Sequence, residues 1–147
     1  MRLDELFIHK VSANWETKPG YHRAEFTDSS GSLVSVKFYD ASNLTDSIVD
    51  IEFDRDGSQA ITGAGSAAEV LSSVYHVILE YLRQYPADYV LFSAREPSRQ
   101  RLYRAMVNRL SLNSGYTQIP AKDVPGGFGD SASVFALKKI ANKQDTQ

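Results

Sequence analysis

The chain has 147 residues, 42% of them hydrophobic and 23% charged, which fits one globular domain large enough to bury a core without cross-links. It contains no cysteine, so disulfides, thiolate metal sites and a cysteine nucleophile are excluded. The formal net charge of −2 lacks the basic excess that an electrostatic footprint for DNA or RNA needs, and we expect no nucleic-acid partner.

The first eight residues have the pattern of a short amphipathic turn of helix, with Leu3, Leu6 and Phe7 on one side. This start is too polar for the apolar core of a signal peptide, and no run reaches the ~18 apolar residues that span a bilayer. We therefore expect a cytoplasmic protein without a membrane partner. Residues 1–20 are interpreted as an N-terminal extension of a single domain, and residues 142–147 as a flexible tail.

Three segments have the alternation of apolar and polar side chains that is typical of strands. They are residues 21–26, 33–39 and 48–53. In the last of them Glu52 lies between Ile51 and Phe53 and is predicted to face away from their apolar side. Residues 54–58 read as a turn, and a short strand over 59–62 leads into Gly63-Ala64-Gly65-Ser66.

The longest helix is predicted over residues 67–85, where apolar side chains recur with helical spacing. Ser66 and Glu69 match a capping box at its start, and Pro86 ends it. A compact apolar run then predicts a buried strand over residues 89–94.

A second helix begins at Pro97 and extends to about Leu110, and two strands over residues 116–119 and 133–137 close the chain. These elements predict an α/β (α+β) domain with a central, mostly antiparallel mixed sheet, one long helix and a second C-terminal helix. The strand at 89–94 should run parallel to the one that ends near Thr62, with the long helix as a right-handed crossover.

The order of these elements over about residues 20–140 resembles the GCN5-related N-acetyltransferase (GNAT) superfamily. In that family a glycine-rich turn opens the long helix and holds the pyrophosphate of CoA with backbone N–H groups. The resemblance implies that acetyl-CoA is the cofactor, bound by Gly63, Ala64, Gly65, Ser66 and Ala67, with no metal. A helix N-terminus suits this task because its first N–H groups have no partner within the helix.

The second helix carries the other half of the resemblance. The segment from Glu96 to Tyr103 matches the family's Asn-x-x-Ala-x-x-Leu-Tyr stretch in length and in its Leu-Tyr pair, with Glu96 and Arg99 in place of the Asn and the Ala. The resemblance implies that Tyr103 protonates the departing thiolate. The alternative is a core tyrosine, because Tyr103 lies on the apolar side of its helix.

A second resemblance, to an uncharacterised family common in tailed-bacteriophage genomes, rests on two strings and on the leader Met1-Arg2-Leu3-Asp4-Glu5-Leu6-Phe7. The strings are Gly57 … Thr62-Gly63-x-Gly65 … Val70 and Phe92-Ser93-Ala94 … Ser98-Arg99-x-x-Leu102-Tyr103-x-x-Met106-x-x-Arg109. It implies a viral origin and no defined activity.

The remaining candidates are single residues. Ser98 and Arg99 directly follow a buried strand, where α/β sheets often carry sites, and are candidates to bind an anionic group of the cofactor. Arg99 could equally form a surface ion pair with Glu96 or Asp88. Glu52 is the candidate base, facing either a substrate groove or water. The three histidines lack ligand spacing, so we expect no zinc site.

Two functions follow as expectations. The first is an acyl-CoA-binding N-acetyltransferase-like protein that transfers an acetyl group directly to an amine substrate. The second is a non-catalytic phage accessory or virion-associated protein that keeps the fold, with a phage or host protein as its partner.

Overall fold

The computed structural model describes residues 13–28, 31–55, 66–93, 97–126 and 134–140. The amphipathic turn expected in residues 1–8, the short strand at 59–62 and the tail from 142 lie outside these residues. So does Thr62, against which the direction of the 89–94 strand was predicted.

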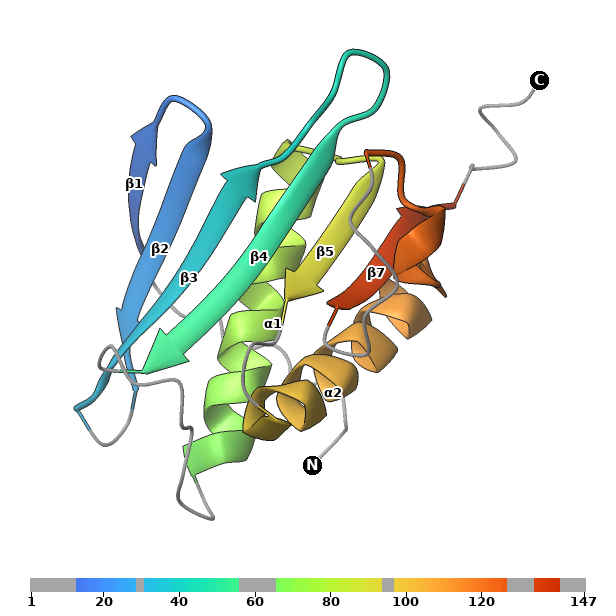
Figure 1. Ribbon diagram of the computed structural model, residues 1–147. Helices are drawn as coiled ribbons and strands as arrows, with labels where there is room; N and C mark the ends of the chain where they lie inside the picture. The colour runs from blue at the N-terminus through green and yellow to red at the C-terminus, as the bar shows by residue number, and fades with distance from the viewer. Residues whose placement is uncertain (1–12, 29–30, 56–65, 94–96, 127–133, 141–147) are drawn as a thin grey trace. The chain divides into compact units, whose positions relative to one another are not determined.

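The described residues form an α+β fold, a mixed and mostly antiparallel sheet of seven strands with two helices, which confirms the predicted fold class (Figure 1). Hydrogen-bonded neighbours follow the order β1-β2-β3-β4-β5-β7-β6. The strands are β1 (Asn14–Lys18), β2 (Tyr21–Thr27), β3 (Leu33–Asp40), β4 (Ile48–Arg55), β5 (Tyr89–Ser93), β6 (Tyr116–Ile119) and β7 (Val134–Lys139). The helices are α1 (Ser66–Gln84) and α2 (Pro97–Asn113), with a short 3₁₀ turn, η2 (Ala121–Asp123).

Two compact units make up the chain. The first unit consists of Met1–Asp40 and Asp50–Pro86, and the second of Ala41–Val49 and Ala87–Gln147. The candidate site residues are divided between them, so each unit is described by itself.

In the first unit, α1 covers one face of the strands. Trp15 pairs with Ala24 on β2, and Ala24 pairs with Val36 on β3, so their side chains share a face. Phe38 lies on the same face and stacks on Tyr81 of α1 at 3.9 Å between ring centroids. This face is apolar because alternate residues of each strand point toward the helix. The buried residues of this face are Ala24, Phe26, Val34, Val36, Phe38, Ile51 and Phe53, and those of α1 include Val70, Val74, Ile78 and Tyr81.

The second unit pairs β7 antiparallel with both β5 and β6. Its α2 helix packs on β6 and β7 through residues that the helical spacing had predicted to point inward, among them Met106, Val107 and Leu110. A second group of buried residues consists of Ile48, Leu91, Ala121, Val124 and Ala136.

Most elements differ from their predicted bounds by one or two residues, and three differ by more. β1 lies within the residues taken as an N-terminal extension, and it was missed because Asn14–Lys18 has a single large apolar residue, Trp15, among four polar ones. The second helix continues to Asn113, three residues beyond Leu110. The turn η2 was not expected, and its Ala121 and the next residue after it, Val124, are buried in the core of the second unit.

Candidate functional site

The first helix begins at the segment that was predicted to bind the pyrophosphate of CoA. α1 starts at Ser66, immediately after Gly63, Ala64 and Gly65, which lie outside the described residues. Its first residues, Ser66, Ala67 and Ala68, are small, and its first turn also carries the acidic Glu69. The first backbone N–H groups of a helix are in general groups that an anion can approach.

The start of the second helix holds the other two predicted cofactor residues. Ser98 and Arg99 follow Pro97 in the first turn of α2, which contains no acidic residue. No carboxylate in that turn therefore offsets the partial positive charge of the helix N-terminus. Such a helix end is favourable for binding an anionic group.

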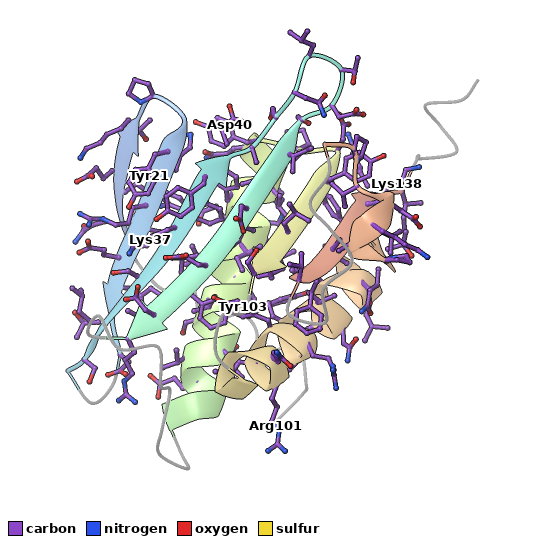
Figure 2. The ribbon with its side chains drawn as sticks, in the orientation of Figure 1. Tyr21, Lys37, Asp40, Arg101, Tyr103 and Lys138 are labelled. Atoms are coloured by element: carbon purple, nitrogen blue, oxygen red, sulfur yellow. The ribbon has the colours of Figure 1, made fainter. Side chains whose placement is uncertain are left out.

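Tyr103 lies in the middle of α2 and belongs to the core of the second unit (labelled in Figure 2). Its side chain is 1% exposed, and its ring packs at a tilt against Phe92 of β5, with 5.6 Å between centroids. A general acid must reach its substrate directly or through one water. The observed position is that of a packed aromatic residue.

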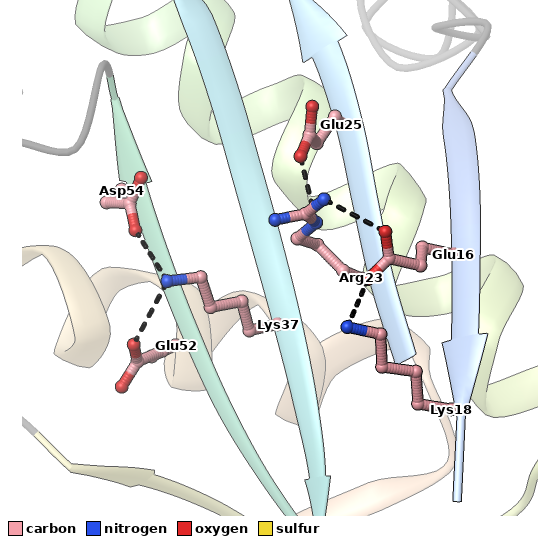
Figure 3. A network of polar contacts seen from close by, with 7 residues as sticks. All are labelled: Glu16, Lys18, Arg23, Glu25, Lys37, Glu52 and Asp54. Carbon is pink, nitrogen blue, oxygen red and sulfur yellow. Dashed lines mark hydrogen bonds and ion pairs between the residues drawn. The ribbon is translucent and has the colours of Figure 1, made fainter. Parts of the chain in front are cut away.

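Glu52 lies on β4, on the face of the first unit that points away from α1, as the strand alternation predicted. Its carboxylate is 3.9 Å from Nζ of Lys37, and Asp54 reaches the same ammonium at 3.5 Å (Figure 3). The side chains of Glu52 and Lys37 are 40% and 27% exposed. Glu52 is therefore an accessible carboxylate that already has a cationic neighbour.

Burial and the charges around Lys37 shift the pKa values of Lys37 and Tyr39. Burial lowers the pKa of Lys37, but the negative charges around it, Asp54 foremost, outweigh burial and hold that pKa above its ordinary value. Burial raises the pKa of Tyr39, and the charge of Glu52 raises it further. Lys37 thus stays protonated near neutral pH, and its ammonium is a partner for Glu52 rather than a nucleophile.

Sequence reasoning named Glu52 and overlooked Lys37 and Tyr39. A signal was present, because the alternation in β3 that buries Val36 and Phe38 turns Lys37 and Tyr39 to the other face, beside β4. A second polar group lies farther along that face, where Arg23 of β2 contacts Glu25 at 2.8 Å and Glu16 at 3.2 Å (Figure 3).

The described residues bring the candidates together only in part. Ser66 and Ala67 share α1, and Ser98, Arg99 and Tyr103 share α2. No three histidine, aspartate or glutamate side chains in the described ranges converge as a metal site would require. No helix among the same residues is long and apolar enough to cross a membrane.

Comparison with known proteins adds a family without a known role. Residues 23–117 match the model of a Family of unknown function (DUF6934). The match begins in β2 and ends in β6, so it includes both helices. No curated protein matches the chain.

Proposed function

This chain belongs to a family of unknown function, DUF6934, and we propose from its own residues that it binds an acyl-CoA and transfers the acyl group to an amine. In this proposal residues 63–67 hold the pyrophosphate. Ser98 and Arg99 contact another anionic part of the cofactor. The cytoplasm, where CoA esters are available, is the proposed place of action.

One observation carries the proposal, namely that α1 begins at Ser66 directly after the glycine segment and between β4 and β5. This is the order of elements on which the resemblance to acetyltransferases rests. Small residues at a helix start, where the first N–H groups lack partners within the helix itself, are the kind of site that binds phosphates elsewhere. Support therefore comes from the position of the glycines relative to α1.

The chemistry of transfer depends mainly on proximity in this proposal. Holding a thioester beside an amine supplies much of the rate of a direct transfer, because the two groups no longer have to meet from solution. Tyr103 is the proposed acid and Glu52 the proposed base. Their observed contacts, a packed ring and a nearby ammonium, argue that each contributes less than the cofactor site does.

Calorimetric titration with acetyl-CoA tests the proposal. We expect binding to the wild-type chain and none to Gly65→Val, because a branched side chain would obstruct the approach of phosphate to the backbone. Leu44→Val, at a fully exposed loop leucine, is the matched control and should bind like wild type. Absence of heat at millimolar acetyl-CoA, with folded protein, would contradict the proposal.

A second candidate function is a non-catalytic accessory protein of a bacteriophage, associated with the virion or with a host protein. The 1% exposure of Tyr103 favours it, because a buried hydroxyl has no path to a departing sulfur. The resemblance of residues 57–70 and 92–103 to a phage family also supports this role. A folded chain that binds no acyl-CoA in the titration would favour this candidate over the first.

A further inference from the structure

The strand β1 is the outer strand of the sheet in the described part of the chain. It joins β2 through the two-residue turn Pro19-Gly20, closed by the pair of Lys18 with Tyr21. The carbonyl of Gly20 accepts a hydrogen bond from the N–H of Asp40 on β3, so Gly20 faces β3 and Tyr21, one residue on, faces β1. Lys18 and Glu16 therefore direct their backbone groups toward β2, whereas Thr17 and Trp15 direct theirs outward.

The side chains of β1 are accessible and carry opposite charges two residues apart. Lys18 and Glu16 are 67% and 42% exposed in their side chains, lie on the face away from α1 and are 3.4 Å apart as an ion pair within the chain. Trp15 is 40% exposed and lies on the other face, where it stacks with Phe38. A strand with this pattern can meet a partner through its backbone, through charge and through an aromatic ring.

We propose that two copies of this chain pair through β1, antiparallel, about a two-fold axis at Thr17. Each Thr17 then exchanges both backbone hydrogen bonds with the partner's Thr17. Each Glu16 lies directly opposite the partner's Lys18, which gives two cross-strand ion pairs. Each Trp15 lies opposite the partner's Pro19 and can cover part of its exposed ring with an apolar side chain.

Several registers would place the α1 side of one sheet next to the α1 side of the other. Among these registers, the one centred on Thr17 pairs opposite charges. Shifting the axis to Glu16 would place the two Glu16 carboxylates opposite each other, which is unfavourable. Shifting it to Trp15 would place Glu16 opposite Asn14 and lose both ion pairs. Lysine and proline usually protect an edge strand from pairing. In β1, however, Lys18 would meet the partner's Glu16 and Pro19 would meet the partner's Trp15, so two copies of the strand are complementary.

Charge reversal provides the test, measured by sedimentation equilibrium with the full chain. Wild type should show a monomer–dimer equilibrium at high concentration. Glu16→Lys alone and Lys18→Glu alone each convert both ion pairs into repulsions, and each should weaken self-association by about tenfold or more. An equal mixture of the two variants should associate like wild type, because every pair across the two-fold is again of opposite charge.

The mixture also guards against a trivial explanation. Glu16 contacts Arg23 at 3.2 Å and Lys18 at 3.4 Å in its own chain, so both single reversals also remove contacts within the chain. Mixing cannot repair damage within one chain, so rescue assigns the effect to the contact between copies. Arg83→Glu, an exposed reversal at the end of α1, should leave association unchanged.

Fluorescence provides a second readout, because Trp15 is the single tryptophan of the chain. Its emission should shift to shorter wavelength as wild type associates, and again in the mixture. A wild-type chain that stays monomeric in the millimolar range would overturn the proposal. So would single variants that associate like wild type, or a mixture that stays as weak as its components.

Discussion

At the scale of single residues, Tyr103 shows how one side chain can satisfy two interpretations of the same sequence. The Leu-Tyr pair in the second helix suggested an acid, and the helical spacing suggested a core residue. The observed position agrees with the core residue that the helical spacing suggested, because the ring of Tyr103 is almost fully buried beside Phe92. A sequence motif gives only the type of residue at a position. The burial of that residue depends on all the elements that pack around it.

Tyr103→Phe separates the two roles because it keeps the ring and removes only the hydroxyl. A hydroxyl buried to this degree normally has a hydrogen-bond partner in the protein, so we expect the free energy of unfolding to fall by about 1 kcal/mol. Tyr85→Phe is the control, because Tyr85 is 48% exposed and its loss should cost little. Urea denaturation of the two variants provides the measurement.

The catalytic role makes a different prediction for the same variant. Turnover would drop by roughly 10²-fold at unchanged stability, the lower range for a lost general acid. That result would contradict the structural role. A variant that equals wild type in both stability and turnover would refute both roles.

At the scale of elements, the sequence predicted the segments with strong periodicity closely and the weakly patterned ones poorly. β6 has the predicted bounds, and β2, β3, β4 and α1 differ by one or two residues. The strand β1 has a single apolar residue to bury, and η2 depends on contacts made by Ala121 and Val124 in the folded second unit. Such contacts join residues far apart in sequence, so the local pattern of apolar and polar residues does not predict them.

One hydrogen bond ties β6 to the segment before β5, and its pH dependence can be measured. Tyr116 donates to the carbonyl of Ala87 at 2.6 Å. Burial, followed by the charge of Asp88, raises the pKa of Tyr116 to about 12 from an ordinary value near 10. Because the folded state holds this proton more tightly, its contribution to stability is complete below pH 10 and is lost as pH rises from about 10 to about 12.

Tyr116→Phe should therefore lose about 1 kcal/mol near neutral pH and show a shallower decline of stability between pH 10 and 12. Urea denaturation at stepped pH provides the measurement. A residual decline is expected, because burial also raises the pKa of Tyr81 to about 12. An equally steep decline in wild type and Tyr116→Phe would contradict the assignment.

At the scale of the whole molecule, composition and the order of elements were sufficient to predict the α+β class. They gave only candidate residues for the site and did not predict which of those residues lie together. The paired charges around Glu52 come from β3 and β4 together, and a single-strand pattern does not state which residues become neighbours across strands. Residues 23–117, which match the family model, include α1 and α2 and therefore most of the candidate site. A test on this chain bears on that family as well.

The central claim is that the segment from Gly63 to Ala67 receives the pyrophosphate of CoA. Amide resonances of the ¹⁵N-labelled full chain, followed during titration with CoA, test it most directly, with adenosine as the control ligand that lacks the pyrophosphate. We predict that the amides of residues 63–67 shift with CoA and stay unchanged with adenosine. Unchanged amides in this segment at millimolar CoA, or shifts confined to other residues, would contradict the claim.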